Sequence, residues 1–367
     1  AYGVVVDERL RKALPDFARY YFDLFKPRGQ VDFACHLDGP TNDMDCTLAL
    51  TLRHCAVSVP HFPYPLSDVS GGVTIDVETG SVLLRRIVGR DGAIVVDGVS
   101  APRGKKRLTH LCVKLRGLQI DDDLLAALPG GDVLSDLHLS GRVSGCVDLT
   151  IIQNARTTIA YSAVLYPQNC SINAGVEFDN ISGSVVLSGH YGRKNHLDPI
   201  HLDLRGMTVY GFQIERVVCT MEVGEEGVKF SGLEGSVYGG RLEGSVSVGR
   251  NGADLKVSVS KASVRRAAEH LFGTKMRKVT GEVSASFTGR LGKKSFSGKG
   301  RIRLRHANIW QVPLFSELVR VLSLGAVKGI PFYKAGAKFE LKHDRIRFPN
   351  AYFYSAVIGL KGRGSLT

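Results

Sequence analysis

Apolar and polar residues alternate along much of this chain. The segment 281–288, GEVSASFT, places Val283, Ala285 and Phe287 on one side and polar residues on the other. The segment 254–260, DLKVSVS, repeats the pattern. A period of two is typical of a β-strand with one buried face. The alternation therefore predicts strands that have one apolar and one polar face.

Such segments follow one another at short spacing. Further examples are GSVVLSGH, DLRGMTVYG and FELKHDRIRF, and the separators GEEG, GRNGAD and KHDR have the length of hairpin turns. Consecutive strands are thus predicted to be antiparallel neighbours in a meander. The pair Gly239-Gly240 is predicted to be a turn between segments 233–238 and 241–248, or a bulge. Strands of about seven or eight residues would be roughly 25 Å long.

Helices are predicted in four short places. Acidic first turns, capping residues and helix breakers mark them. They are 7–25, interrupted at Pro15; 121–128, which ends before Pro129; 263–272, which Ser263 caps and Gly273 ends; and 313–324.

The helices divide the chain. We predict an N-terminal helical segment at 1–27, a first β-groove repeat at 28–139, a second at 140–277 and a C-terminal β segment at 278–367. Weak internal similarity supports repeats of about a hundred residues. LSDVSGGVTI at 66–75 resembles FDNISGSVVL at 178–187, and KLRGLQI at 114–120 resembles DLRGMTV at 203–209.

Composition is close to that of globular proteins except for glycine, with 42 in 367 residues. Apolar runs all fall short of the roughly 18 residues that span a bilayer, and the N-terminus lacks a signal-peptide pattern. A start at Ala1 and an end within a strand pattern predict a segment of a longer protein, which would supply any anchor. The net charge of +13 favours an acidic partner, such as phospholipid headgroups, lipopolysaccharide or nucleic acid, or else a solvated surface.

The seven cysteines form no CxxC pair, and an odd number argues against a complete disulfide framework. Neighbours such as His54 and Cys55 point to opposite faces of a strand, so we expect buried or unpaired thiols and no metal. His190, His196 and His201 are expected in a polar loop.

Catalytic signatures are missing from the sequence. The motifs GxSxG, HExxH, the P-loop and a strand-bound GxGxxG do not occur. The run Asp121-Asp122-Asp123 resembles an acidic cluster, but it suits the start of a helix better. We predict a protein that is not an enzyme and that has no cofactor other than bound phospholipid.

Two basic segments are candidate headgroup contacts. Arg301, Arg303 and Arg305 alternate with Ile302 and Leu304, which predicts a charged row on one face of a strand. Nucleic-acid binding would require aromatic residues among the arginines, and the segment has none on that face. A solvated outer face is the first interpretation, and a basic rim for anionic headgroups is the second. The loop residues of the same class are Lys105, Lys106 and Arg107.

A long meander must cover its apolar face. It can close on itself, pack on a second sheet, or curl into a trough filled by something oily; abundant glycine and short helices favour the trough. The residues predicted to line it are Val237, Leu242, Val246, Leu255, Val257, Val259, Val283, Phe287, Ile302 and Leu304. In the alternative, these side chains meet one another in a closed core.

The segment 313–324 has a broad apolar stripe. It would gate one end of the trough or touch a membrane, or it would cap the edge of the sheet. The stripe consists of Leu314, Phe315, Leu318, Val319 and Leu322.

Parts of the sequence resemble a known family. The segment 233–248, LEGSVYGGRLEGSVSV, is similar to a strand pair common in AsmA-like proteins. The order of elements in 295–366 also resembles the end of those proteins: a G-x-G strand, a helix opened by PLF, a strand pair and a closing G-x-G. AsmA-like proteins belong with TamB- and YhdP-like proteins among the bacterial relatives of bridge-like lipid transfer proteins.

The resemblance implies a mainly β fold, a long antiparallel meander curled into an elongated, taco-like groove with a few short helices. It also implies a non-enzymatic segment of an envelope-spanning protein that shields phospholipid acyl chains in the periplasm of a diderm bacterium and serves outer membrane biogenesis. Family members usually begin with a transmembrane helix, which is absent from this sequence.

The partners expected are phospholipids, membranes at one or both ends and envelope proteins, and not nucleic acid. The alternative function is a structural or adhesive β-repeat envelope protein with a closed core and no lipid cargo. An enzyme that modifies envelope polysaccharide would need a cleft of paired acids, which the sequence does not indicate.

Overall fold

The structure is a computed structural model of the 367-residue chain. It describes residues 1–14, 19, 22–23, 25–39, 45–59, 62–127, 138–173, 177–192, 195–209, 211–224, 227–249, 252–273, 279–292, 295–308, 332–342, 345–356 and 359–366. The predicted helix at 313–324 lies outside these residues, together with its apolar stripe.

The described residues form one antiparallel sheet of 21 strands with three short helices, so the predicted mainly β meander is confirmed. The chain divides into two compact units: residues 1–177 with 184–198, and residues 178–183 with 199–367. The first unit contains β1 (Val4–Val5), β2 (Arg28–Asp38), β3 (Asp45–Val59), β4 (Phe62–Asp76), β5 (Val82–Gly89), β6 (Ile94–Arg103), β7 (Lys106–Ile120), β8 (Ser140–Gln153), β9 (Thr157–Asn173), most of β10 (Glu177–Tyr191), and β11 (His196–Leu197). The second contains β12 (Ile200–Val209), β13 (Phe212–Gly224), β14 (Gly227–Val237), β15 (Gly240–Gly249), β16 (Gly252–Ser263), β17 (Thr280–Gly292), β18 (Ser295–Asn308), β19 (Phe332–Lys342), β20 (Arg345–Ser355) and β21 (Gly359–Leu366).

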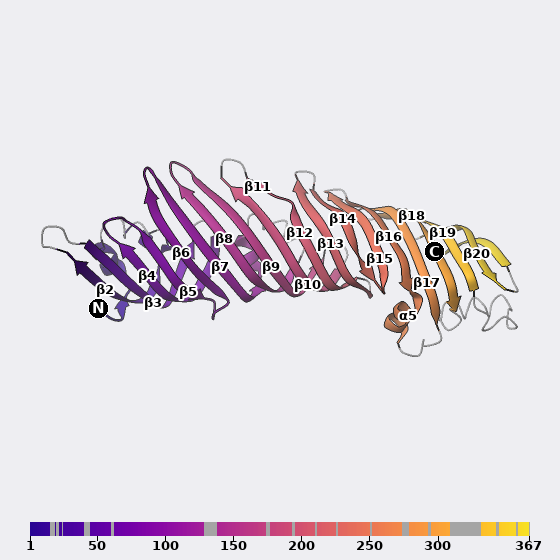
Figure 1. The fold of residues 1–367 in the computed structure, drawn as a ribbon, viewed down its shortest axis with the longest axis horizontal. Coiled ribbons are helices and arrows are strands. Elements are labelled where there is room, and N and C mark those ends of the chain that lie inside the picture. Colours follow the sequence, from indigo (N-terminus) through magenta and orange to yellow (C-terminus); the bar gives the residue numbers. More distant parts are fainter. Residues whose placement is uncertain are drawn as a thin grey trace. The chain divides into compact units, whose positions relative to one another are not determined.

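Within each unit, strands that follow one another in the chain also lie side by side (Figure 1). The three predicted hairpins are present, since Gly224 pairs with Gly227, Gly249 with Gly252, and Lys342 with Arg345. Of the two predictions for Gly239-Gly240, a turn or a bulge, the turn is confirmed. Tyr238 and Gly239 both have positive φ (47° and 75°) and form the turn between β14 and β15. A turn with two positive φ angles matches the twist of the strands it joins.

The strands are longer than the sequence predicted. Strands β14 to β18 contain 10 to 14 residues instead of seven or eight. Pairing continues past the alternating apolar segments because glycine and polar residues extend each ladder, and because bulges let a strand continue after a local irregularity. A strand of about 12 residues is roughly 40 Å long.

The same type of β-bulge, defined by two consecutive residues, recurs in both units. A residue with φ between 49° and 70° is followed at once by a buried residue. The backbone turn carries the second residue to the covered side of the sheet, and its burial offsets the roughly 1–2 kcal/mol that a left-handed conformation costs a non-glycine residue. The eight examples are His54 with Cys55, Asp68 with Val69, Gly117 with Leu118, Asn169 with Cys170, Asn180 with Ile181, Gly206 with Met207, Lys261 with Ala262, and His306 with Ala307.

These bulges account for the internal sequence similarity. In both members of the first similar pair, the motif is a left-handed Asp68 or Asn180, a buried neighbour, a serine and a glycine. That glycine, Gly71 or Gly183, has φ of 145° or 135°, and a Cβ there would lie within 2.9 Å of a backbone Cα on the adjacent strand. In the second similar pair, Gly117 and Gly206 occupy the left-handed position. The similarity thus marks a repeated local bulge.

The three helices in the described part of the chain are where the sequence predicted them. Helix α1 (Glu8–Ala13) is capped by Asp7, α3 (Asp122–Ala127) by the Asp121 carboxylate, which accepts a hydrogen bond from the Leu124 amide at 2.8 Å, and α5 (Val264–Phe272) by Ser263. Helix α5 ends at Gly273, whose φ is 83°. The interpretation of the acidic run at 121–123 as a helix start is confirmed.

Candidate functional site

The ten residues predicted to line a trough share one face of the second unit. They lie on five consecutive strands, β14 to β18. Leu242 pairs with Val259, Val259 with Ala285, and Ala285 with Ile302, so one apolar row crosses four strands. Val257 lies opposite Phe287 in the same way. Paired residues in a sheet project to the same side, so the alternation predicted from sequence produces a continuous apolar face.

This apolar face is incompletely covered. Val237 and Leu242 are buried, with 9% and 6% of their surface exposed, whereas Val257 and Ile302 are half-buried. Among the described residues, the principal contacts between strands join neighbours in the sheet, and the most extensive helix contacts are those of α3 with β4 and of α5 with β13, β16 and β17. A second sheet packed on the face would bury it to the level of a protein interior. The described residues provide no such layer.

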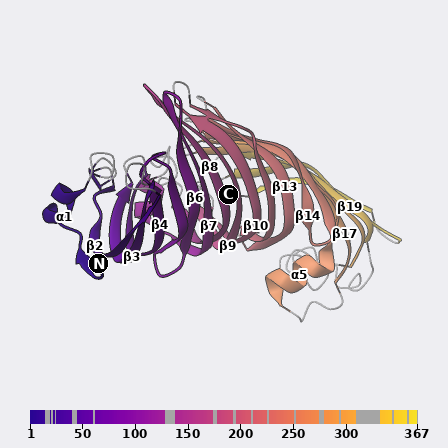
Figure 2. The same cartoon turned by 60° about the vertical axis from the view of Figure 1, so that its left-hand side comes forward.

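Helix α5 covers one end of these strands (Figure 2). Ala268 of the helix packs with Val279 and Ala307, which are fully buried, and Leu304 and Phe353 border this cluster. The bulge at His306 turns Ala307 toward the helix. Residues near α5 are therefore closed off, while those farther along the strands remain half-exposed.

Phenylalanine rings lie flat on glycines in the middle of the face. The Phe287 ring occupies the space where Gly289 and Gly298 would carry a Cβ, and the Phe339 ring does the same over Gly300. Phe287 and Phe339 are nearly parallel, at 12°, with centroids 6.2 Å apart. Glycine allows a ring to lie against the backbone, and the ring in turn shields the glycine. The result is a smooth apolar surface, and it explains part of the glycine excess.

The first unit has a matching apolar face that the sequence analysis did not single out. Leu111 pairs with Leu149, and Val113 pairs with both Val96 and Val147. The alternation in segments 108–115 and 147–152 is the signal that could have found these residues. Helix α3 covers part of this face, where Leu124 and Ala127 form a buried cluster with Tyr64, Ile94, Leu118 and Val143.

A partly buried cluster of Arg90, Asp121 and the buried Tyr64 lies at the start of α3. The Arg90 guanidinium lies 4.4 Å from the Tyr64 ring centroid and 3.6 Å from the Asp121 carboxylate. Burial, and secondly the negative charge of Asp121, raise the pKa of the Tyr64 hydroxyl. This cluster fixes the start of the helix against β4.

The predicted basic residues fall in two different settings. Lys105 and Lys106 lie at the turn between β6 and β7, whereas the Arg107 guanidinium folds back to donate hydrogen bonds to the Ser100 hydroxyl (3.2 Å) and the Gly80 carbonyl (2.8 Å). Arg301, Arg303 and Arg305 lie along the middle of β18, on the face opposite to Ile302 and Leu304.

The expectation that the arginine face lacks aromatic residues is wrong. Gly336 pairs with both Arg303 and Tyr352, so Tyr352 projects from β20 to the arginine side. Lys334 pairs with Arg305 and with Tyr354 in the same manner. The aromatic residues come from a strand that lies more than forty positions further along the chain, so the local sequence did not reveal them.

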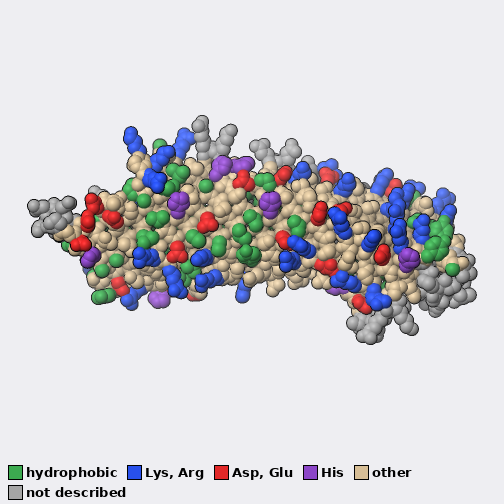
Figure 3. Space-filling view, in the orientation of Figure 1, with side chains coloured by type: hydrophobic (Ala, Val, Ile, Leu, Met, Phe, Trp, Pro, Cys, Tyr) green, Lys and Arg blue, Asp and Glu red, His purple; other side chains and the backbone are tan. Residues whose placement is uncertain are grey.

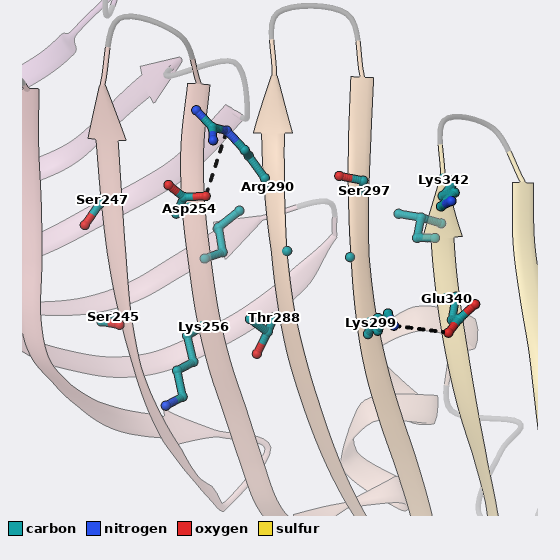
Figure 4. Close-up of a pocket in the computed structure, with 14 residues that line it drawn as sticks. Ser245, Ser247, Asp254, Lys256, Thr288, Arg290, Ser297, Lys299, Glu340 and Lys342 are labelled. Atoms are coloured by element: carbon teal, nitrogen blue, oxygen red, sulfur yellow. Dashed lines mark ion pairs between the residues drawn. The ribbon is translucent and has the colours of Figure 1, made fainter.

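A shallow hollow of about 580 Å³ opens on the polar face of β15 to β19 (Figure 4). Two ion pairs cross it: Arg290 lies 4.0 Å from Asp254, and Lys299 lies 3.5 Å from Glu340. Lys256 and Lys342 also line the hollow, together with the hydroxyl residues Ser245, Ser247, Thr288 and Ser297. The charged residues of the lining therefore have a positive excess.

All seven cysteines are free, as predicted. Cys55, Cys170 and Cys219 are buried, and burial raises the pKa of Cys219 to about 11. Cys35 and Cys46 face each other diagonally across β2 and β3, with their sulfur atoms 3.3 Å apart. Proximity to Cys35 is the main cause that raises the pKa of Cys46.

The described residues contain no group of three or more His, Cys, Asp or Glu side chains that could hold a metal ion. The rings of His190 and His196 contact each other across β10 and β11, tilted by 37° with centroids 5.4 Å apart, and His196 lies 3.2 Å from Asp198. The prediction of a polar loop for the three histidines is wrong, because His190 lies on β10, His196 on β11 and His201 on β12. None of the helices that the structure describes has the length and hydropathy of a membrane span.

Comparison with family models, with curated proteins and with solved structures yields no match to this chain.

Proposed function

We propose that this chain binds phospholipid acyl chains along the apolar face of its sheet and thereby conducts or shields them without catalysis. The observation that carries the proposal is the apolar face of β14 to β18, which is continuous across strands and incompletely covered by protein. Apolar surface of this extent costs free energy in water, at roughly 25 cal/mol per Å². Acyl chains are a chemically suitable cover.

The proposed mechanism depends on an apolar face that is nearly the same at each position. Rows of valine, leucine and flat phenylalanine present similar contacts at each position, so an acyl chain would slide between nearly equal energy minima. Headgroups would stay in water beyond the strand ends. Lys105 and Lys106, at the β6–β7 turn, would then favour anionic species.

The setting follows from the AsmA-like resemblance and is proposed with it. The chain would be a segment of an envelope-spanning protein, located between the inner and outer membranes of a diderm bacterium, with membranes at one or both ends and envelope proteins as partners. In the structural or adhesive alternative, the apolar face would be covered by protein and would carry no lipid.

The direct test is native mass spectrometry of the purified chain, followed by solvent extraction and identification of lipids. We expect phospholipids in more than one copy per chain, since the face crosses many strands. A lipid-free, monodisperse protein prepared without detergent would contradict the proposal and favour the structural alternative.

A charge in the middle of the face should prevent occupancy. We expect Val257→Asp to lower bound lipid at least tenfold, because an ionised carboxylate would lose hydration beneath an acyl chain; tenfold corresponds to about 1.4 kcal/mol. The matched control is Ser258→Asp, which places the same charge one residue further on, on the polar face. Equal lipid content in Val257→Asp and Ser258→Asp, with both folded, would exclude lipid contact at this position.

A further inference from the structure

The last four strands carry a concentration of positive charge. The described residues of β18 to β21 contain eleven Lys and Arg and one acidic residue, Glu340. Strand pairing places all eleven on the face opposite to the apolar rows. They are Lys299, Arg301, Arg303, Arg305, Lys334, Lys338, Lys342, Arg345, Arg347, Lys361 and Arg363. We call this surface the basic face; Lys and Arg side chains gather over the right-hand part of the molecule in Figure 3.

Several of these charges oppose one another directly. Arg301 pairs with Lys338 and Arg305 with Lys334 across β18 and β19, and Lys342 pairs with Arg345 across β19 and β20. Like charges at paired positions destabilise a sheet. Among the described residues, the one ion pair on this face joins Lys299 to Glu340 at 3.5 Å. The sheet thus tolerates a repulsion that a bound polyanion would relieve.

The basic face contains a small hollow of about 160 Å³. The residues that line it are Arg301, Ile302, Arg303, Ala337, Lys338, Asn350 and Tyr352. The Tyr352 ring lies against Gly336, with the Lys334 amine 6.0 Å from its centroid. Three cations beside amide and hydroxyl donors are a suitable environment for a phosphate group.

We propose that the basic face binds the phosphate groups of anionic phospholipids at a membrane surface, and that Arg301, Arg303 and Lys338 hold one headgroup in the hollow. This interaction uses the opposite side of the sheet from the proposed acyl-chain face, and it does not depend on that function.

A planar anionic surface suits the arrangement better than nucleic acid does. The cations cover four adjacent strands in two dimensions, roughly 14 Å across and several residues along each strand. A single-stranded nucleic acid favours a groove with aromatic residues spaced along it. Here the aromatic residues gather at one side, where Tyr354 stacks with Tyr333 at 6.4 Å and lies 5.6 Å from Tyr352.

The test is cosedimentation of the full chain with vesicles of phosphatidylcholine alone or of phosphatidylcholine with 30% phosphatidylglycerol. We expect binding only to the anionic vesicles, and weaker binding as salt increases. The variant Arg301→Glu/Arg303→Glu/Lys338→Glu should bind at least tenfold more weakly.

The matched control carries the same change in net charge elsewhere. Lys114 and Lys229 lie exposed on β7 and β14, and Arg156 lies exposed between β8 and β9; no ion pair within 4 Å joins them to described residues. Lys114→Glu/Arg156→Glu/Lys229→Glu should bind nearly as the unaltered chain does. Equal losses in the two triple variants, or equal binding to neutral vesicles, would overturn the proposal.

A second set of variants and two further measurements address misfolding, nucleic-acid binding and the acyl-chain face. If the glutamate variant does not fold by circular dichroism, Arg301→Gln/Arg303→Gln/Lys338→Gln replaces it, with the corresponding glutamines in the control. Binding of a fluorescent single-stranded oligonucleotide is titrated in parallel. If the chain bound the oligonucleotide more tightly than anionic vesicles, and the Arg301→Glu/Arg303→Glu/Lys338→Glu variant lost that binding, nucleic acid would replace the membrane as the partner. Bound lipid identified by mass spectrometry should be unchanged in the variant, which separates this test from that of the acyl-chain face.

Discussion

At the scale of single residues, the cysteines are small packing residues. Cys55 and Cys170 take the buried position that follows a left-handed residue, and Ala262 and Ala307 take the same position in other bulges. A thiol is close to alanine in its demand for space and behaves as a small hydrophobe when buried. The number of cysteines in this chain therefore carries little information about disulfides or about the compartment.

Thiol labelling should separate the cysteines into two classes. With iodoacetamide at pH 8 we expect rapid alkylation of Cys35 and Cys146, which are exposed, and very slow alkylation of Cys55, Cys170 and Cys219 until the protein is unfolded. The thiolate is the reactive form, and with a pKa of about 11 roughly one Cys219 in a thousand is ionised at this pH. Peptide mass spectrometry would measure the order. Early alkylation of Cys219 in the folded protein would contradict its placement.

At the scale of elements, the bulges give each strand its bend and bury a residue at the same time. Gly281 shows how close the strands come there, because a Cβ on it would lie 2.6 Å from the Cα of Ala307. The bulge in β16 depends on Lys261, whose φ is 56°. A β-branched residue tolerates this conformation poorly, whereas glycine adopts it freely.

We therefore expect Lys261→Val to lower the free energy of unfolding by about 1–2 kcal/mol, and Lys261→Gly to leave it unchanged or raise it slightly. Native-state hydrogen exchange of β16 peptides measures both, as free energies of local unfolding. Lys256→Val is the control, since Lys256 is an exposed residue of the same strand without a positive φ. Similar losses in Lys261→Val and Lys256→Val would show that backbone strain is not the cause.

Sequence reasoning found the elements because their signals are local. Alternation in 254–260 and 281–288 marks β16 and β17, and Ser263 with Gly273 marks the two ends of α5. The bulge at Lys261 has no such signal, because lysine does not favour a left-handed backbone; tertiary packing imposes it.

The candidate sites also include one part that local sequence predicts and one part that it does not. The shared face of Val257 and Phe287 follows from a period of two and from hairpin pairing. The meeting of Tyr352 with Arg303 depends on the register of three strands, which is set by hydrogen bonds and bulges across a long sequence separation. The sequence of a single strand therefore does not predict which residues of distant strands will lie beside it.

At the scale of the whole molecule, almost every strand is stabilised by its immediate neighbours in sequence. The arrangement resembles that of repeat proteins, in which stability is close to a sum of local terms and neighbour terms. Perturbations should then remain local, and unfolding should not follow a single two-state transition.

Ala307→Leu provides a test. Ala307 is fully buried between the β18 bulge and α5, and three extra carbon atoms should cost about 1–3 kcal/mol. We expect hydrogen exchange to increase in α5, β17, β18 and β19 and to stay unchanged in β3 and β4. Mass-spectrometric exchange on peptides measures each region. A uniform increase across both units would indicate global cooperativity instead.

The pairing of each strand with its sequence neighbours also determines how such a chain changes over evolutionary time. A hairpin inserted between two existing hairpins would form its ladders with the strands on either side, and the alternation would keep its apolar residues on the established face. Deletion of a hairpin would let the flanking strands pair in the same way. Length in this architecture is therefore an adjustable quantity, and we expect homologous chains to differ by whole hairpins more often than by parts of strands.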